Sequence, residues 1–539
     1  MLASLGGVLA GTAAGGVASA VQFAEVAAEA GLDFQHVNGM AGERWILETV
    51  GAGVGVLDFD GDGLLDIWLV QGGTVPEDAS ASATAPRAPR DRLFRNVTSG
   101  GQLRFQDITD TSGVLAGRYG MGIATADVDG DGDADVFLAN YGPNQLFENL
   151  GGGRFREVRA DVLSGAEWSV SASFADIDGD GSLDLYVANY LDFTLRAHKD
   201  CPDLSGRPSY CAPTAYPAVS DRLYRNLGEG RFKDITGDAG IAGLRAPALG
   251  VAAHDFDGDG DADFYVANDG AANHLWLNQG DGTFRDGAEL AFAAFNANGA
   301  PEAGMGVDAE DYDGDCDPDL FVTHLATETN TLYVNHGGWF SDSTAGAGLA
   351  ASSGPYTGFG TGWIDADNDG DLDLFSANGA VFPVERQRLA GDPYPLRQRN
   401  QLWINDGAGV YREFTSAGAL DTEEVSRGAA FADLDNDGDT DIVVSNNSGP
   451  PRLYRNDAAA APWIGLELPQ GTTATLEGET CPLRRASTDG SYASANDPRL
   501  VFRLTQGERR RVHLRWPDGR KTTTAPLRPN RYHRPNAKD

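Results

Sequence analysis

The chain has 539 residues and a formal net charge of −38. Such acidity argues against nucleic acid as a partner, because phosphate backbones are bound by basic residues. Hydrophobic residues make up 41% of the chain, which allows a large buried core, and 70 glycines favour the many tight turns of an all-β repeat fold.

The first twenty residues are small and apolar. They end in Ala18-Ser19-Ala20, which resembles a signal-peptide cleavage site, although the usual basic residues before the apolar run are missing. We therefore expect residues 1–20 to be a signal peptide and the protein to be secreted, periplasmic or on the cell surface. The alternative is a disordered apolar leader. No other run is long enough to span a membrane.

Seven copies of one acidic motif, D-x-D-x-D-G-x-x-D with small variations, are spread along most of the chain. The copies are called loops one to seven below, in chain order. In loop one, DFDGDGLLD, alternating aspartates can converge if the chain curls, and Gly63 allows the sharp turn. The aspartates at the four acidic positions are Asp58, Asp60, Asp62 and Asp66; Asp127, Asp129, Asp131 and Asp135; Asp176, Asp178, Asp180 and Asp184; Asp255, Asp257, Asp259 and Asp263; Asp311, Asp313, Asp315 and Asp319; Asp365, Asp367, Asp369 and Asp373; and Asp433, Asp435, Asp437 and Asp441.

This ligand set predicts calcium, which takes six to eight hard oxygen ligands. The backbone carbonyl of the seventh residue, Leu64 in loop one, can complete the set. No His or Cys recurs in register, which argues against zinc or copper. One isolated copy could be a solvated acidic turn, but seven copies favour metal sites for up to seven calcium ions. Without the ion the carboxylates repel one another, by about 1 kcal/mol per pair at 4 Å in water.

The residues after each loop distinguish it from an EF-hand. An EF-hand has Glu at position twelve and a helix on each side, whereas here Leu69 or Leu138 stands there, inside short β-branched and aromatic runs. Such runs predict strands, so each loop is expected to lie inside a β-hairpin.

Two further strands accompany each loop. One resembles RLFRN and the next resembles FQDIT, but the seventh RLYRN, at residues 452–456, lacks the second strand, which is found instead at Phe23-Ala24-Glu25-Val26. Seven units of about four strands, one of them split between the chain ends, predict a seven-bladed β-propeller, integrin-α-like and closed by the N-terminal strand. The alternative, an open solenoid, does not explain the split unit.

Small-residue strands such as GMGIATA precede the loops and are expected to be the inner strands, because small residues allow close approach. A polar residue follows five positions after each loop. These residues either line one rim of the channel or, as we favour, cap strand ends; they are Gln71, Asn140, Asn189, Asn268, His324, Asn378 and Asn446.

The chain contains four cysteines. Cys201 and Cys211 bracket a long insert, and we expect them to form a disulfide if the protein is exported. Cys316 occupies the glycine position of loop five, where a Cβ is strained, so loop five is predicted to be the weakest calcium site. The sequence leaves open whether Cys316 and Cys481 pair with each other, and free buried thiols are the favoured state.

The pattern changes after residue 458. We predict a calcium-binding propeller over residues 21–458 and a small β domain over residues 459–539, which carries 14 Lys/Arg against 8 Asp/Glu. This basic domain either docks on the acidic propeller through charge, binds an acidic glycan or anionic surface, or only presents a solvated basic face.

The loops with their flanking strands resemble the FG-GAP/VCBS repeats of integrin-α-type propellers. The stretch GSYASANDPRLVFRL, followed by VHLRWPDG, resembles the ASPIC/UnbV domain, and the combination is similar to the cartilage acidic protein family and its bacterial relatives. The resemblance implies a secreted, calcium-loaded propeller with an appended β domain, often linked to adhesion, and implies no catalytic activity. Where the family has the motif F-G-L-G, this chain has Phe502-Arg503-Leu504-Thr505 instead.

The favoured function is therefore an exported scaffold that binds an extracellular protein or glycan and has no catalysis of its own. The alternative is a carbohydrate-active enzyme, a lyase or hydrolase, with a site at the propeller axis. Its acid and base would have to come from residues outside the repeats, and the candidates are His198, His324, Glu328 and Tyr210. A third hypothesis is a structural protein that assembles through its C-terminal domain.

Overall fold

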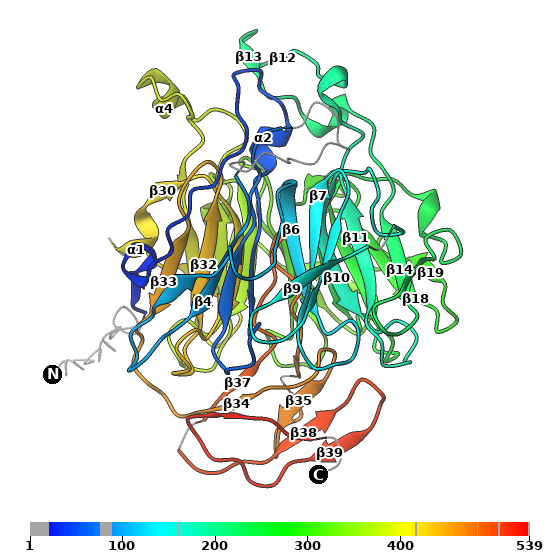
Figure 1. Ribbon diagram of the computed structural model, residues 1–539, viewed down its shortest axis with the longest axis vertical. Coiled ribbons are helices and arrows are strands. Elements are labelled where there is room, and N and C mark those ends of the chain that lie inside the picture. The colour runs from blue at the N-terminus through cyan, green and yellow to red at the C-terminus, as the bar shows by residue number, and fades with distance from the viewer. Residues whose placement is uncertain are drawn as a thin grey trace, which may run out of the picture.

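The computed structural model describes residues 21–75, 89–159, 161–203, 205–415, 418–481, 483–504 and 507–536. The expected signal peptide lies outside these residues. The fold is all-β, with antiparallel sheets and only short helices (Figure 1). The helices are α1 (Ala27–Ala30), α2 (Leu47–Val50), α3 (Ala350–Ser353), α4 (Glu385–Leu389), η1 (Leu195–Ala197), η2 (Pro213–Ala215), η3 (Ile241–Gly243) and η4 (Ala419–Asp421).

Within the described residues, seven sheets share one antiparallel order of four strands, and each predicted acidic loop joins the first strand to the second. In pairing order the strands are β2 (Val54–Leu57), β3 (Asp66–Leu69), β4 (Arg92–Asn96) and β5 (Phe105–Asp107); β6 (Tyr119–Ala126), β7 (Asp135–Tyr141), β8 (Gln145–Asn149) and β9 (Phe155–Val158); β10 (Ser169–Ala175), β11 (Asp184–Asn189), β14 (Arg222–Asn226) and β15 (Phe232–Asp234); β16 (Ala248–His254), β17 (Asp263–Ala271), β18 (His274–Asn278) and β19 (Phe284–Asp286), with β20 (Glu302–Ala303) beside β17; β21 (Val307–Glu310), β22 (Asp319–Val322), β23 (Thr331–Asn335) and β24 (Phe340–Asp342); β25 (Gly358–Ile364), β26 (Asp373–Asn378), β28 (Gln401–Asn405) and β29 (Tyr411–Glu413); and β31 (Ser426–Ala432), β32 (Asp441–Asn446), β33 (Arg452–Asn456) and β1 (Phe23–Glu25).

The last of these sheets joins the two ends of the repeat region. Strand β1 pairs antiparallel with β33, with Phe23 opposite Asn456 and Glu25 opposite Tyr454. The N-terminal strand therefore supplies the outermost strand that the seventh unit lacks in sequence.

The first strands of the seven sheets lie side by side at the centre. Each contacts the first strand of the sheet before it and of the sheet after it, and β31 contacts β2. Small residues permit this approach. A Cβ on Gly122 would lie 2.0 Å from the carbonyl oxygen of Val170 on the next first strand.

The C-terminal residues form two small sheets below the seven (Figure 1, orange to red). One has the order β37 (Leu500–Arg503), β34 (Trp463–Leu466) and β40 (Tyr532–His533); the other has β36 (Arg484–Arg485), β35 (Thr473–Leu476), β38 (Val512–Arg515) and β39 (Lys521–Thr523). Two further pairs, β12 (Cys201–Pro202) with β13 (Pro208–Ser209) and β27 (Gln398–Arg399) with β30 (Glu423–Glu424), belong to the inserts.

Residues 489–495 leave the C-terminal sheets and enter the space among the seven first strands. We call this stretch the axial segment. It forms at least one hydrogen bond with each first strand, namely Val56 N–H to Ala495 O, Ile123 N–H to Ala493 O, Ala493 N–H to Ser171 Oγ, Ala253 N–H to Asp489 Oδ2, Val307 N–H to Ser491 O, Thr361 N–H to Ser491 Oγ and Ser491 Oγ–H to Ala429 O.

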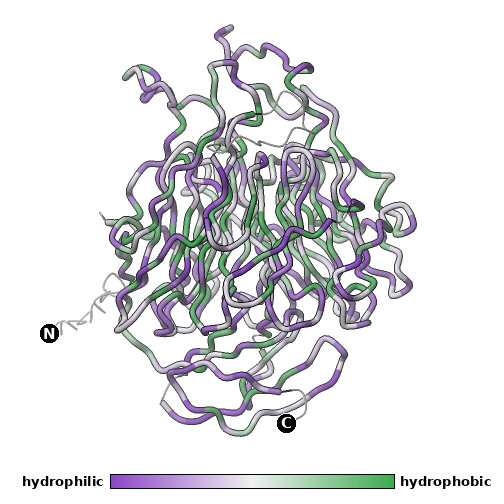
Figure 2. The backbone as a smooth tube through the Cα atoms, viewed as in Figure 1, coloured by the Kyte–Doolittle hydropathy of each residue, from purple (hydrophilic) through white to green (hydrophobic). Residues whose placement is uncertain are grey.

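Hydrophobic residues follow the strands of the sheets, and hydrophilic residues are frequent in the connecting loops (Figure 2). At the end opposite the C-terminal sheets, Tyr492 of the axial segment is fully buried and belongs to one apolar cluster with Trp168 and Phe359. No helix in the described ranges has the length and apolar character needed to cross a membrane.

Candidate metal centres

Loop one shows how the acidic motif folds. Asp58 Oδ1 accepts hydrogen bonds from the backbone N–H groups of Gly61 and Asp62, at 2.9 and 3.1 Å, and its Oδ2 accepts one from Gly63 at 2.9 Å. Gly63 has a φ of 87°, a left-handed conformation that glycine adopts at little cost. The chain therefore curls around the first aspartate, as the motif predicts.

Several of the predicted ligands are brought together. Carboxylate oxygens lie within 4.8 Å of one another in Asp58, Asp60 and Asp62; in Asp127, Asp129 and Asp135; in Asp176, Asp178 and Asp184; and in Asp255, Asp257 and Asp259. Such clusters also occur on acidic surfaces without a metal, so proximity alone does not identify a site.

A second observation supports a cation. The Oδ1 atoms of Asp60, Asp365 and Asp367 are buried and accept no hydrogen bond, although a buried polar atom without a partner costs free energy. These atoms belong to the first or third positions of loops one and six. The residues present fit calcium, because the donors are all oxygens and some of them lack any other partner.

The ninth position has a second role that the motif did not reveal. Asp66 is fully buried, and its two oxygens accept the backbone N–H groups of Phe59 at 3.0 Å and Asn96 at 2.7 Å. Burial raises the pKa of Asp66 to about 8. The equivalent aspartates accept the same two bonds, and burial raises their pKa to about 7 for Asp135 and Asp184, about 8 for Asp263 and Asp373, and about 9 for Asp319.

The asparagine that ends each third strand has a role that the sequence motif did not predict. Asn96 Nδ2 donates to the Leu65 carbonyl of its own loop at 2.9 Å and to the Leu434 carbonyl of loop seven at 2.8 Å. Five other asparagines likewise donate to the loop of the preceding sheet; they are Asn149, Asn226, Asn278, Asn335 and Asn456. The recurring final N of RLFRN, QLFEN and RLYRN was the available signal. These side chains hold neighbouring loops in fixed positions.

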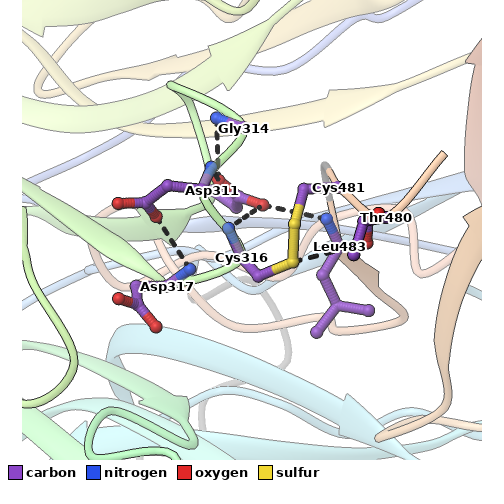
Figure 3. The surroundings of a disulfide bond; sticks show 8 residues. Asp311, Gly314, Cys316, Asp317, Thr480, Cys481 and Leu483 are labelled. Carbon is purple, nitrogen blue, oxygen red and sulfur yellow. Dashed lines mark hydrogen bonds between the residues drawn. A yellow bond between two sulfur atoms is a disulfide. The ribbon is translucent and has the colours of Figure 1, made fainter.

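Loop five is tied to the C-terminal domain (Figure 3). Cys316 and Cys481 form a disulfide across a sequence separation of 165. The prediction of two free thiols was therefore wrong, because Cys481 lies on a strap of the C-terminal domain that crosses loop five. The backbone N–H of Leu483 donates to Asp311 Oδ2 at 2.9 Å. Cys316 has a φ of 83°, the left-handed conformation expected for its position.

Basic and aromatic residues of the same domain reach loops six and seven. Arg503 Nε donates to Asp365 Oδ2 at 2.9 Å, while Asp365 Oδ1 keeps no partner. Tyr532 donates its hydroxyl to Asp433 Oδ2 at 2.7 Å, and Arg499 Nη2 donates to the Asp433 carbonyl at 2.6 Å. Docking of the basic domain on the acidic loops thus involves charge, but insertion of the axial segment adds a buried contact that charge does not explain.

Among the described residues, loops one, two and three receive no such hydrogen bond from the C-terminal domain. Together with Leu468, Gln470 and Pro517 of the C-terminal domain they line a cavity of about 780 Å³. The C-terminal domain therefore contacts loops five, six and seven and leaves a hollow beside loops one, two and three.

The polar residues at or near the end of each second strand cap loops rather than line a channel. All seven are buried. Six donate a side-chain hydrogen bond to a backbone carbonyl, namely Gln71 to Gln35, Asn140 to Pro143, Asn189 to Ser220, Asn268 to Ala272, Asn378 to Arg399 and Asn446 to Pro450. His324 differs, because neither of its ring nitrogens has a hydrogen-bond partner and its Nε2 lies 3.7 Å from Glu302 Oε2. Burial lowers its pKa to about 4.

The axial segment occupies the place that the enzyme hypothesis assigned to a substrate. Of the candidate residues, Tyr210 donates its hydroxyl to Glu48 Oε2 at 3.0 Å, and Glu328 Oε2 accepts the Ala303 backbone N–H at 2.9 Å. Tyr210 and Glu328 therefore bond to different partners, and neither ring nitrogen of His324 takes part in a hydrogen bond with either of them.

The insert between the second and third strands of the third sheet stands at the end of the molecule away from the C-terminal domain (Figure 1). Its expected disulfide, Cys201–Cys211, is present with a Cα–Cα distance of 5.1 Å. Together with Cys316–Cys481 it leaves no free cysteine among the described residues.

Family models agree with this architecture. The FG-GAP-like repeat model matches residues 58–138, 127–187, 214–266, 255–322, 311–376 and 390–444, and the ASPIC and UnbV model matches residues 470–538. The first set covers more than half of the chain. The chain belongs to the FG-GAP-like repeat family and ends in an ASPIC and UnbV domain.

The similarity extends to animal proteins. Over 305 residues this chain is 25% identical to cartilage acidic protein 1 of Mus musculus and 24% identical to that of Homo sapiens. The match covers 54% of this chain and 44% and 43% of those proteins, so less than half of their length is represented.

Solved structures with remote similarity to this chain are also known. An Agrocybe aegerita lectin described as recognising non-reducing terminal N-acetylglucosamine aligns over 69% of this chain and 87% of its own, with 17% identity and a TM-score of 0.38. YCF48 bound to D1 peptide aligns over 82% and 98%, with 7% identity and a TM-score of 0.42. These scores are too low to support a functional argument.

Proposed function

We propose that the protein is an exported, calcium-binding scaffold that binds an extracellular protein or glycan and performs no catalysis of its own. The observation that carries the proposal is the set of buried carboxylate oxygens without donors in loops one and six. A cation is the simplest partner for these oxygens, of which one lies in loop one, in a cluster with Asp58 and Asp62, and two lie in loop six.

The frame would be a seven-bladed β-propeller closed by the N-terminal strand. Seven sheets with one strand order, cyclic contacts among their first strands and the pairing of β1 with β33 all support it. The asparagine bonds between neighbouring loops, including that from Asn96 to loop seven, support the same arrangement.

Calcium would be held by the first, third and fifth aspartates of each loop, with the carbonyl of the seventh residue. The ninth aspartate already accepts two backbone hydrogen bonds and orients the loop, although its remaining lone pairs can still serve the ion. Bound calcium would remove the repulsion among the carboxylates. Ions that bind only the folded state stabilise it, by about 2.7 kcal/mol per site at a hundredfold excess over Kd.

Export is supported by the two disulfides, because such bonds persist in oxidising compartments. It is also supported by the millimolar calcium outside cells, which suits numerous weak sites. The cavity beside loops one to three and the insert held by Cys201–Cys211 are the non-repeated surfaces where a ligand would bind.

Thermal denaturation with and without calcium tests the proposal. We expect EDTA to lower the melting temperature strongly, calcium to restore it, and magnesium at equal concentration to restore it less. An unchanged melting temperature in EDTA would falsify calcium binding. Screens of glycans and matrix proteins in calcium and in EDTA would then test the binding role.

A further inference from the structure

One turn recurs between neighbouring sheets at the outer rim. The outermost strand of the next sheet begins with an aromatic residue, whose backbone N–H donates to a carbonyl of this turn, and the residue after that carbonyl is glycine. The three clearest cases are Phe155 to Ser112 before Gly113, Phe284 to Ala239 before Gly240, and Tyr411 to Ala347 before Gly348.

Glycine is required there for two reasons. The φ angles of Gly113, Gly240 and Gly348 are 82°, 85° and 82°, which side chains with a Cβ adopt only with strain. In addition, a Cβ would lie 2.5, 3.3 and 2.8 Å from the carbonyl oxygen of the aromatic residue in these three turns.

In the turn between the fourth and fifth sheets this position is occupied by Phe292. The same hydrogen bond is present, from Phe340 N–H to the Ala291 carbonyl at 2.7 Å, and Phe292 has a φ of 60°. Its side chain is 68% exposed, so burial of the ring does not compensate for the strain. A strained residue without a packing role is a candidate for function.

Two other large apolar residues lie beside it. Leu290 precedes Ala291 and is 78% exposed, and Trp339 precedes Phe340 and is 50% exposed. All three therefore stand within one residue of the same hydrogen bond. We call Leu290, Phe292 and Trp339 the rim patch. Contiguous exposed apolar residues on a folded domain mark interaction surfaces, and aromatic side chains dominate the affinity of such surfaces.

We propose that the rim patch binds a protein segment that presents apolar side chains next to Lys or Arg. The apolar part follows from the patch itself; Leu290, its most exposed member, offers no hydrogen bond, which favours a protein over a sugar. The basic part follows from charge, because the chain has a formal net charge of −38, which stays strongly negative even with seven calcium ions bound, and Glu289 is exposed beside Leu290. Opposite charge accelerates encounter and selects the partner. The inference rests on the proposed binding function and adds its site and partner chemistry.

The test uses the full chain in calcium and a fluorescein-labelled peptide of alternating Lys and Leu, with a Glu and Leu twin. Fluorescence polarisation should show binding of the Lys peptide only. Phe292→Gly should lower the affinity for the Lys peptide by about tenfold or more, as expected for an aromatic anchor. It should leave the melting temperature unchanged or raised, because glycine suits the left-handed turn. Leu389→Ala, which removes an exposed leucine on α4, should change neither value.

Four results would overturn the assignment: equal affinity of Phe292→Gly and the original chain, no binding of the Lys peptide, equal binding of both peptides, or a lower melting temperature of Phe292→Gly. Self-association that disappears in Phe292→Gly would instead assign the patch to a second copy, and binding of a neutral oligosaccharide lost in Trp339→Ala would assign it to a glycan. The calcium dependence of the melting temperature is measured separately, so failure of the scaffold proposal is distinguishable from failure of the patch.

Discussion

Tyr492 donates its phenolic hydroxyl to the backbone carbonyl of Val50 at 3.1 Å, across 442 residues of sequence. The ring is fully buried and lies 4.9 Å from the ring of Phe359 between centroids. The C-terminal domain thus reaches through the first strands to the opposite end of the molecule. Its contribution to stability is therefore expected to come from inside the repeat region.

Tyr492→Ala should lower the free energy of unfolding by about 3–5 kcal/mol, because it leaves a large cavity among the first strands. Tyr492→Phe removes only one hydrogen bond and should cost about 1 kcal/mol. Denaturant unfolding of both variants measures the difference, and Leu389→Ala is the exposed control. A cost near zero for Tyr492→Ala would show that the axial segment does not stabilise the repeats.

The disulfide between Cys316 and Cys481 should stabilise the fold by cross-linking distant parts of the unfolded chain. In the loop-closure model, a cross-link over 165 residues contributes up to about 5 kcal/mol and one over 10 residues contributes less. We therefore expect the pair of changes Cys316→Gly and Cys481→Ser to lower the melting temperature more than Cys201→Ser with Cys211→Ser. The reverse order would contradict the model for this protein.

Loop five should make the smallest contribution to calcium stabilisation. Its sixth residue carries a Cβ in a left-handed conformation, and Leu483 already donates to Asp311 Oδ2. Asp311→Asn should therefore reduce the calcium-induced rise in melting temperature less than Asp127→Asn, the same change in loop two. Isothermal titration of both variants checks the assignment, and an equal loss in both would refute it.

His324 should make the protein sensitive to acid. Its folded pKa of about 4 lies below the unfolded value of about 6.5, so the folded state binds fewer protons and stability is lost as pH falls from about 6.5 to 4. The loss reaches at most about 3 kcal/mol. His324→Asn, the residue found in five other repeats, should remove this part of the pH dependence.

Urea unfolding at pH 7 and pH 4.5 measures that prediction, with His513→Asn at an exposed position as the control. Parallel pH profiles of His324→Asn and the original chain would mean that burial of this imidazole has no effect on acid stability.

The repeats could be predicted from the sequence because each one carries its own local motif. The spacing of Asp58, Asp60 and Asp62 predicts a curled loop, and the missing last strand of the seventh unit predicts the pairing of Phe23–Glu25 with β33. The first prediction depends on residues that are neighbours in sequence, and the second depends on comparing one repeat unit with the others.

The contacts of the C-terminal domain could not be read in this way. Apart from Tyr492, residues 489–495 are small or polar and resemble a loop in sequence. Their burial depends on the space that residues distant in sequence leave among the first strands. A Cβ on Gly53 would lie 1.5 Å from the Ala493 carbonyl oxygen, so the complementarity exists only between distant positions. The same holds for Cys316 and Cys481, whose pairing requires the strap to cross loop five.

The hydrogen bonds of residues 489–495 have a consequence for biosynthesis. These residues leave the ribosome after all seven first strands. During translation the first strands therefore come together before the axial segment that packs among them has been synthesised. Early domains of a nascent chain can normally fold as they emerge, but here the repeat region has to wait for the last sixth of the polypeptide. A stop codon shortly after residue 458 would therefore yield every repeat and still produce a protein prone to aggregation and degradation.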